Sequence, residues 1–357
     1  MSLDTSERWF ESAGIVDYSE LATTTSHNGS PPPDRRFPRL VDGATFIDGL
    51  SSVPDALWGE PGRILAAVGE PLMLVGPQGV GKTSVGQQLA LARLGLREHV
   101  LGLPVFPDER RVLYLAMDRP RQAARSLARM IQTDSERKVL RERLLVYEGP
   151  PPFSVVKSPE ALAEMALAVG AGLLVLDSYK DLVPGIAKDE IGAAVNIALQ
   201  HVIAARVEIT GLHHQRKANE GNKSPNSLDD VYGSVWLTSG HGSVVLLWGK
   251  PGDAFVELRH LKPPVEAVGP LNVQHNHARG VSSVVDEIEL EELLAAAPVG
   301  LTAHDAAGQL FAKSEPDRNE VERARRRLER LVGEGTARRV EPELVTEAVR
   351  YRLEEGS

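Results

Sequence analysis

One short stretch of the chain carries residue types whose spacing predicts a specific chemistry. Residues 76 to 84 contain the G-x-x-x-x-G-K-T pattern of a phosphate-binding loop (P-loop). Glycines let successive backbone N–H groups turn towards phosphates, and the following helix directs its positive end at the same anion. Lys82 is predicted to contact the outer phosphates, and the Thr83 hydroxyl to bind Mg²⁺. The residues expected to bind the nucleotide are Gly76, Pro77, Gln78, Gly79, Val80, Gly81, Lys82, Thr83 and Ser84.

The sequence around this loop predicts the elements that must position it. The apolar run from Leu72 to Val75 is predicted to form a strand, and the pattern from Lys82 to Ala92 predicts a helix. The P-loop motif requires this strand–loop–helix setting. The alternative, a glycine-rich turn that binds nothing, does not explain why a strand and a helix flank the motif. Downstream, apolar and helical stretches alternate, which predicts an α/β fold with a mainly parallel sheet covered by helices. A hairpin predicted at residues 243 to 261 adds an antiparallel edge.

Two aspartates follow predicted strands. Asp177 ends the apolar stretch Leu173–Leu176 and is predicted to complete the Mg²⁺ site, on the expectation that its strand lies next to the P-loop strand. Asp118 ends the first strand after the P-loop and is predicted to orient or deprotonate the attacking water. The alternative for both is a turn or capping aspartate, and Pro120 suits the first turn of a following helix.

Two adjacent histidines, His213 and His214, end the strand after Asp177. Neighbouring residues on a strand point to opposite faces, so a shared metal ion is not expected. His214 is predicted to sense the γ-phosphate or its attacking water. The alternative is a histidine with a structural role.

Composition narrows the class of protein. Hydrophobic residues make up 42% and charged residues 25% of the 357 residues, as in ordinary globular proteins. No apolar run reaches the ~20 residues that span a bilayer, and no secretory signal is evident, so we expect a cytoplasmic protein with no membrane partner. The absence of cysteine excludes disulfides and thiolate metal sites. A net charge of −9 means that any nucleic-acid contact must come from local basic patches.

Composition also predicts three parts of the chain. Residues 1 to 36 are predicted to form an N-terminal extension with a flexible linker, residues 37 to 275 the domain that contains the P-loop, and residues 284 to 357 a small C-terminal domain. Residues 269 to 283 are predicted to be a linker. The apolar segment from residue 37 to 68 is expected to cover the nucleotide site or to pack against a neighbouring subunit.

At these motifs the chain resembles the RecA-like hexameric ATPases. The nearest members are the plasmid RepA-type and DnaB-type replicative helicases and related phage or actinobacterial AAA-type ATPases. The resemblance covers roughly residues 40 to 275 and rests on five ordered segments: Gly76–Thr83, Val112–Asp118, Leu173–Asp177, Leu212–Lys217, and Ser227–Ser234 running into Val244–Trp248. It implies a RecA-like P-loop fold, ATP and Mg²⁺, a homo-oligomeric ring that is hexameric in the family, and single-stranded DNA in the ring. Asp118 stands where the family usually has glutamate, which leaves the rate of hydrolysis open.

The resemblance also implies that a basic residue reaches into the site of a neighbouring subunit. Lys262 matches the lysine of the Lys-x-Arg pair that DnaB-like proteins use in this way, whereas Pro264 replaces the arginine. Arg216 and Lys217 are the other candidates. No arginine that would act within the same chain is evident. The loop from Ala218 to Ser227 occupies the place of the DNA-facing loop of the family, and the alternative is a solvated surface loop.

The C-terminal segment resembles a winged helix. Its expected recognition helix, Arg318–Gly333, carries arginines that suit contact with duplex DNA. The alternatives are a solvated face and a surface for docking a protein. These arginines are Arg318, Arg323, Arg325, Arg326, Arg327 and Arg330.

The predicted function is therefore an ATP-binding and hydrolysing RecA-like motor that acts on DNA, as a helicase-type ATPase in replication or recombination. The first alternative is an ATP-switched DNA-binding regulator that does not translocate. A P-loop small-molecule kinase is less favoured, because it requires an arginine-bearing lid that the sequence does not clearly offer.

Overall fold

The computed structural model describes residues 40–48, 51, 53–216, 225–285, 289–311, 313, 315–341 and 348–354. The chain divides into two compact units, Met1–Ser52 and Val53–Ser357. Within the first unit, the described residues contain the short helix α2 (Gly43–Asp48). The extension expected at residues 1 to 36 lies outside the described residues.

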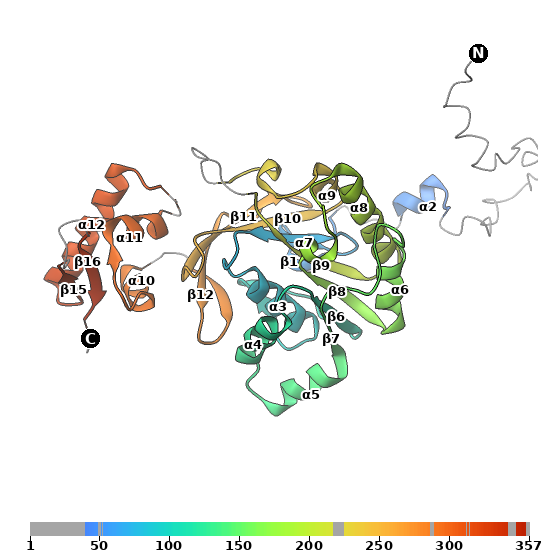
Figure 1. Ribbon diagram of the computed structural model, residues 1–357, viewed down its shortest axis with the longest axis horizontal. Coiled ribbons are helices and arrows are strands. Elements are labelled where there is room, and N and C mark those ends of the chain that lie inside the picture. Colours follow the sequence, from blue (N-terminus) through green and yellow to red (C-terminus); the bar gives the residue numbers. More distant parts are fainter. Residues whose placement is uncertain are drawn as a thin grey trace, which may run out of the picture. The chain divides into compact units, whose positions relative to one another are not determined.

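A large sheet forms the centre of the second unit (Figure 1). The six strands from β10 to β7 are parallel, and β11, β12 and β13 extend one edge as antiparallel strands. This arrangement confirms the predicted α/β fold class, with a mainly parallel sheet covered by helices. In spatial order the described strands are β13 (Val281–Val285), β12 (Leu271–Asn276), β11 (Phe255–Lys262), β10 (Ser243–Trp248), β3 (Leu72–Gly76), β9 (Glu208–His214), β8 (Ala171–Asp177), β6 (Arg111–Ala116) and β7 (Leu144–Glu148).

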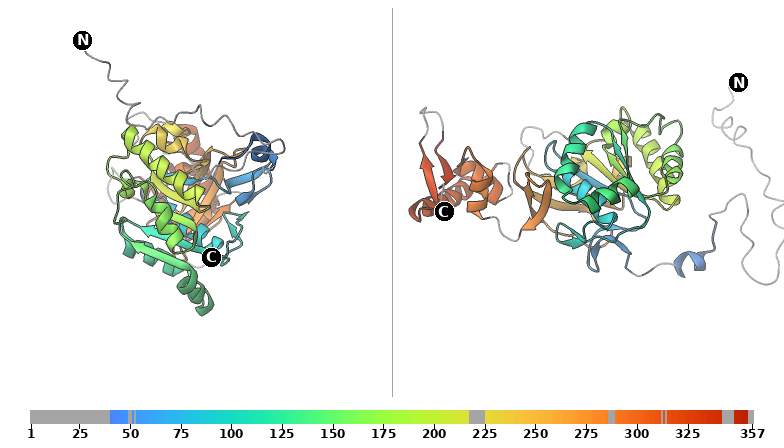
Figure 2. Two further views of the ribbon diagram at one scale, coloured as in Figure 1. Left: turned by 90° about the vertical axis from the view of Figure 1, so that its right-hand side faces the viewer. Right: turned by 90° about the horizontal axis from the view of Figure 1, so that it is seen from below.

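Helices cover both faces of this sheet, as the views in Figures 1 and 2 show. Alternate residues of β3 supply the two cores: Leu72 and Leu74 pack on one face, and Met73 and Val75 on the other. This alternation is the period of two that a strand buried on both sides requires. On the first face lie α3 (Lys82–Arg93), α4 (Pro120–Met130) and α5 (Asp134–Arg143); on the second lie α6 (Ala161–Ala168), α7 (Tyr179–Leu182), α8 (Asp189–Ala204) and α9 (Val235–Ser239).

The order of the strands corrects one expectation. β9 lies between β3, which leads into the P-loop, and β8, which ends at Asp177. The strand of Asp177 is therefore not the neighbour of the P-loop strand. Strand order depends on which crossover connections the chain makes, and a local apolar pattern carries no information about them.

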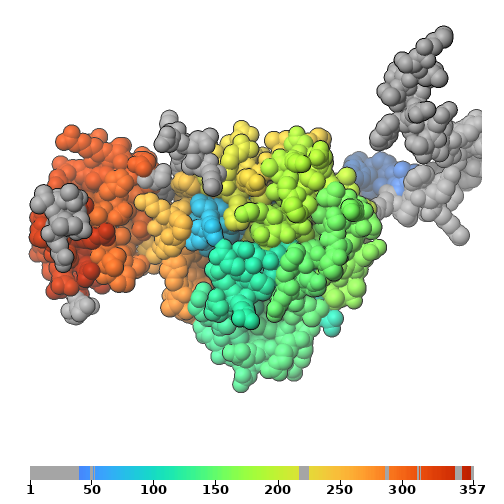
Figure 3. Space-filling model, in the orientation of Figure 1, coloured from blue at the N-terminus to red at the C-terminus, as the bar shows by residue number. Residues whose placement is uncertain are grey.

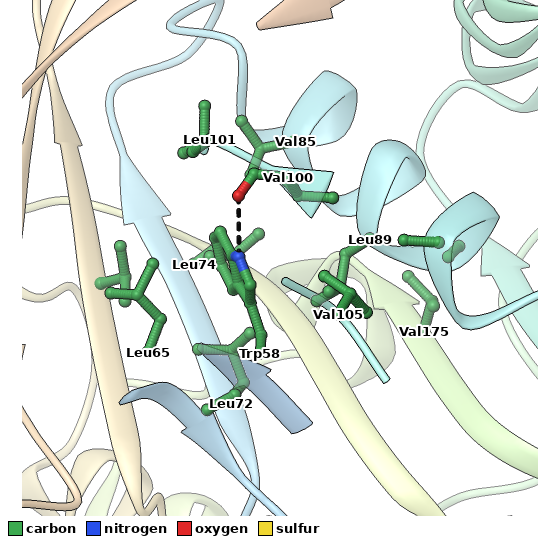
Figure 4. Packing of buried hydrophobic residues seen from close by; sticks show 14 of the residues in the cluster. Trp58, Leu65, Leu72, Leu74, Val85, Leu89, Val100, Leu101, Val105 and Val175 are labelled. Atoms are coloured by element: carbon green, nitrogen blue, oxygen red, sulfur yellow. Dashed lines mark hydrogen bonds between the residues drawn. The ribbon is translucent and has the colours of Figure 1, made fainter. Parts of the chain in front are cut away.

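A small hairpin completes the core on the face of α3. β1 (Ala56–Glu60) pairs with β2 (Arg63–Ala67), and the short strands β4 (His99–Val100) and β5 (Leu103–Pro104) lie beside it. Trp58 is fully buried, and its indole N–H donates to the carbonyl of Val100 at 2.9 Å (Figure 4). For these strands, the expectation of a cover over the nucleotide site is wrong, whereas a contact with a neighbouring subunit stays a prediction. Their apolar side chains pack in the core of their own chain.

The antiparallel edge corrects the expected linker at residues 269 to 283. That stretch contains β12 and the start of β13, which pair from Asn272↔Val285 to Asn276↔Val281. Short strands rich in histidine, asparagine and serine lack the apolar alternation that predicts a strand.

The C-terminal part contains three helices and a small antiparallel sheet of order β14-β16-β15 among its described residues. Along the chain the order is helix, strand, helix, helix, strand, strand. The elements are α10 (Leu290–Ala296), β14 (Leu301–Thr302), α11 (Ala303–Leu310), α12 (Arg318–Gly333), β15 (Ala337–Val340) and β16 (Arg350–Leu353). No helix in the part of the chain that the structure describes is long and apolar enough to cross a membrane.

Candidate active site

The P-loop joins the end of β3 to the start of α3 at the carboxyl edge of the parallel strands. Gly79 and Gly81 have φ angles of +78° and +95°, which residues with a side chain rarely adopt. Lys82 folds back over the loop, and its ammonium group donates to the carbonyls of Gly76 at 2.8 Å and Pro77 at 2.6 Å. Burial lowers the pKa of Lys82 to about 8, although Asp177 works in the opposite direction. A phosphate that enters the loop would replace the two carbonyls as the partner of this cation.

Thr83 and Asp177 meet next to the P-loop. The Thr83 hydroxyl at the start of α3 donates to the Asp177 carboxylate at 3.1 Å, although β9 separates the strand of Asp177 from β3, which leads into the P-loop. Burial raises the pKa of Asp177, whereas the hydrogen bonds from Tyr114 and Thr83 and the charge of Lys82 lower it. A hydroxyl and a carboxylate oxygen side by side are the protein ligands that Mg²⁺ takes when phosphates and water complete its shell.

Tyr114 is a member of this site that the sequence did not indicate. Its hydroxyl donates to the same Asp177 oxygen at 2.7 Å, and the side chain is almost fully buried. Burial and the neighbouring carboxylate raise the pKa of Tyr114 well above its usual value, so the phenol is a permanent donor. Tyr114 therefore fixes the orientation of the carboxylate that faces Thr83.

Asp118 lies two residues beyond the end of β6, whose last residue, Ala116, pairs with Asp177 on β8. The Asp118 carboxylate accepts a hydrogen bond from the Arg119 guanidinium at 2.8 Å. About half of each side chain is exposed, at 54% for Asp118 and 52% for Arg119. Both residues line the same cavity as Lys82 and Thr83. The structure thus places Asp118 in the nucleotide site without a rigid set of contacts.

The two histidines of β9 point to different surroundings, as expected for adjacent residues on a strand. His213 is fully buried, lies edge-on to the Tyr179 ring and bonds the carbonyl of Tyr232. Burial lowers its pKa to about 3. His214 pairs with Gly76 at the end of β3 and lines the cavity. Burial and the charge of Lys82 lower its pKa, so the neutral form faces the P-loop.

Of the residues expected to act across a subunit boundary, Arg216 and Lys262 do not line this cavity. Arg216 is exposed, and its backbone N–H donates to the carbonyl of Asp230. Lys262 pairs with Val244 near the amino-terminal edge of the parallel strands, whereas the P-loop lies at the carboxyl-terminal edge. Its ammonium group donates to the carbonyls of Thr238 and Ser239 at the end of α9. Lys217 lies outside the described residues.

We call the space around these residues the P-loop cavity. Its volume is about 790 Å³, within the range typical of ligand pockets. Besides the P-loop, its walls are the ends of β6, β8 and β9, the face of α4, the turn between β10 and β11, and the hairpin of β12 and β13. In Figure 3 the sky-blue P-loop segment is visible between the teal segment of α3 and α4 and the orange hairpin segment.

The hairpin of β12 and β13 is the second part of the site that the sequence did not predict. The ring of His275 lies over Gly81, where an added Cβ would come within 2.4 Å of it. Its Nε2 donates to the carbonyl of Val80 at 3.1 Å, so its Nδ1 is the acceptor for the Ser282 hydroxyl at 2.8 Å. Burial lowers the pKa of His275 to about 4, which keeps this neutral tautomer in place. The hairpin of β12 and β13 therefore packs on the P-loop through the buried side chain of His275.

The third unpredicted wall consists of α4 and its N-cap, whose residues on one face line the cavity. Three of them are arginines, in contrast to the expectation that no arginine of the same chain is evident near the site. The lining residues are Arg119, Gln122, Ala123, Arg125, Ser126 and Arg129.

A glycine-rich loop between a strand and a helix, with a lysine over the loop and a threonine bonded to a strand-end aspartate, defines a P-loop nucleotide-binding domain. Residues 39–220, slightly more than half of the chain, match the AAA domain family AAA_25, and the chain belongs to this family. Among solved structures, an ATPase domain is similar, with a TM-score of 0.46 and 11% sequence identity over 61% of this chain and 85% of that chain. No curated protein matches the sequence.

Proposed function

We propose that the protein binds ATP in the P-loop cavity and hydrolyses it. The observation that carries this proposal is the hydrogen bond between Thr83 and Asp177 beside the P-loop lysine. A loop that only bound an anion would not need a buried carboxylate aimed at its threonine, because that carboxylate repels phosphate unless a cation lies between them. Membership of the AAA domain family supports the same conclusion.

Mg²⁺ is the cation that this pair suits. Thr83 and Asp177 would hold it, and when bound it would neutralise the charge that develops on the phosphate oxygens. Among the described residues no group of three or more histidine, aspartate or glutamate side chains could hold a metal ion alone. The metal is therefore expected to bind with the nucleotide rather than before it.

The remaining residues have distinct roles in the proposed reaction. Backbone N–H groups of the P-loop and Lys82 hold the β- and γ-phosphates. Asp118 orients the attacking water and accepts its proton, and His214, neutral and facing the loop, senses the γ-phosphate. The alternative for Asp118 is a capping role, and its exposed carboxylate, bonded to Arg119 rather than to backbone N–H groups of α4, favours the catalytic one.

We further propose that the C-terminal part is a winged helix that contacts duplex DNA. Its order of elements and its sheet order, β14-β16-β15, support the winged-helix assignment. Helix α12 buries Ala324, Leu328 and Leu331, and its arginines other than Arg327 are exposed. Part of this charge is neutralised within the helix, because Arg325 and Arg326 pair with Glu322.

The finer proposal is a motor that assembles as a homo-oligomeric ring, hexameric in the RecA-like family, around single-stranded DNA. An ATP-switched regulator that does not translocate is the alternative. One observation favours a second class, a small-molecule kinase: three arginines of α4 and its N-cap line the cavity, and phosphate transfer to an acceptor also needs positive charge around the transferred group. ATP turnover without any added acceptor separates hydrolysis from phosphate transfer to a small molecule.

The experiment that tests the proposal is phosphate release from ATP with and without single-stranded DNA, with Lys82→Ala as the negative control. We expect turnover by the wild-type protein alone, loss of turnover in the folded variant, and stimulation by DNA. Turnover that is unaffected by DNA would favour the regulator. Equal phosphate release by wild-type protein and the variant would refute the assignment of the site.

A further inference from the structure

Helix α4 is held firmly beside the P-loop helix. The Gln87 side chain on α3 donates to the carbonyl of Ala123 at 2.8 Å. Further along, Met130 is buried against Leu91 of α3 in a small apolar cluster. These two contacts set the rotation of α4, so the identity of the residues that face the P-loop cavity is determined by packing on the opposite side.

The face of α4 that is turned to the cavity is basic. Arg119, Gln122, Arg125 and Arg129 line it, at the spacing of three and four residues that forms one side of a helix. From Arg119 to Arg129 this side extends for roughly 15 Å. Arg121 lies on the same helix, is exposed and does not line the cavity.

The cavity needs more positive charge than the P-loop alone provides. Lys82 is the single cation of the loop, whereas hydrolysis places developing negative charge on the γ-phosphate and on the oxygen that leaves it. Among the described residues that line the cavity, the other permanent cations are the three arginines of α4 and its N-cap. Arg216 and Lys262 do not line it.

Arg119 is the arginine nearest to the reacting groups along the chain. It directly follows Asp118 and caps the start of α4, and its guanidinium bonds Asp118 and, at 3.3 Å, the side chain of Gln122. With about half of the side chain exposed, no close packing holds it in this place. The γ-phosphate carries more charge than one carboxylate and can therefore compete with Asp118 for the guanidinium.

We propose that Arg119 acts within its own chain on the γ-phosphate of ATP, an inference that rests on the proposed hydrolase function. In this structure Arg119 is paired with Asp118. When ATP binds, the guanidinium moves to the γ-phosphate and leaves the Asp118 carboxylate available to the water. The water oxygen then forms a bond to the γ-phosphorus, Asp118 accepts the proton, and the bond to the β-γ bridging oxygen breaks with its electron pair on ADP. The products are ADP and phosphate; Asp118 releases the proton to solvent and pairs with Arg119 again.

The first experiment compares Arg119→Ala with the matched control Arg121→Ala. Arg119→Ala should lower the turnover number by about 10³-fold, as the loss of an arginine that contacts the transferred phosphate does, while fluorescent ATP analogues still bind. It should also fail to trap ADP with aluminium fluoride, a mimic of the transition state that depends on this charge. Arg119→Lys should recover part of the rate, and Arg121→Ala should match the wild type. Wild-type turnover and trapping in Arg119→Ala would overturn the inference and leave the hydrolase function intact.

The second experiment distinguishes action within one chain from action across a subunit boundary. Arg119→Ala protein is mixed with Lys82→Ala protein under conditions that exchange subunits. If Arg119 acts in its own chain, each site in the mixture lacks one of the two groups and activity does not return. Recovery of activity would show that Arg119 serves a neighbour and would overturn the inference. Absence of turnover in the wild-type protein would instead refute the proposed hydrolase function.

Discussion

The buried phenol of Tyr114 allows the site to be perturbed by the removal of a single oxygen atom. Tyr114→Phe keeps the ring and its packing against the sheet but removes the 2.7 Å hydrogen bond to Asp177. A hydrogen bond to a charged group contributes about 1.5–3 kcal/mol. Because Asp177 keeps its bond from Thr83, the carboxylate is not left without a donor, and we expect a loss near the lower end, ~2 kcal/mol. For a domain of this size that corresponds to a decrease in Tm of roughly 4–8 °C.

The loss should depend on pH in a defined direction. Burial raises the pKa of Asp177 above its usual value of 3.8, so ionisation of this group in the folded protein costs stability as the pH rises through the folded pKa. Removal of the Tyr114 donor raises the folded pKa further and increases that cost. The difference between variant and wild type is therefore complete at neutral pH and becomes smaller as the pH falls towards 3.8 and Asp177 is protonated in both proteins.

Thermal unfolding followed by circular dichroism, without nucleotide and at several pH values, measures this effect. The matched control is Tyr147→Phe on the neighbouring strand β7, where the structure gives the hydroxyl no hydrogen-bond partner among the described residues. The Mg²⁺ concentration that gives half-maximal ATP turnover should also rise about 10–100-fold in Tyr114→Phe, because the residue orients a metal ligand. A Tm and a Mg²⁺ requirement equal to those of Tyr147→Phe would refute the role assigned to Tyr114.

Other groups of the site can be tested in the same protein. Because burial lowers the pKa of Lys82 to about 8 and phosphates favour its charged form, ATP binding at pH ~9 should take up about one proton and binding at pH ~7 almost none. Calorimetry in two buffers of different ionisation enthalpy measures the uptake, and Lys82→Arg should abolish it. Asp118→Asn should slow phosphate release by ~10²–10⁴-fold with ATP still bound, whereas Asp177→Asn should weaken Mg²⁺-dependent binding itself; normal release by Asp118→Asn would assign Asp118 a capping role. A chain that ends after Val285, which keeps β13, should retain ATP turnover but bind duplex DNA with lower affinity and a smaller salt dependence in anisotropy titrations; an unchanged salt slope would favour protein docking by the C-terminal part.

Local pattern in the sequence is enough to predict one part of the fold. The apolar run into the P-loop, the strand that ends at Asp177 and the strand with His213 and His214 are all present, because a strand buried on both faces needs a continuous apolar segment. Six of the nine predicted P-loop residues line one cavity, because the motif itself requires a strand, a tight loop and a helix.

The parts of the site that the sequence did not predict depend on contacts between segments that are distant in the sequence. The alternation in β6 indicates the face on which Tyr114 lies, but not that Asp177 on the neighbouring strand is its partner. The arginines of α4 form a regular pattern, yet only the packing of that helix on α3 decides which of them face the cavity. The hairpin of β12 and β13 resembles a linker in sequence because its polar residues contact the P-loop rather than fill a core.

The bond between His275 and the carbonyl of Val80 joins residues 195 positions apart. During synthesis at ~5–20 residues per second, the P-loop leaves the ribosome roughly 10–40 s before the hairpin that closes over it. Until the hairpin emerges, the P-loop lacks the contact of His275 with Gly81 and Val80, and the sheet lacks β12 and β13. A fragment limited to residues 39–220, the region that matches the family, does not contain the hairpin and therefore lacks these contacts permanently. The wall that the hairpin gives to the P-loop is thus added late in biosynthesis, when the end of the sheet reaches back to its beginning.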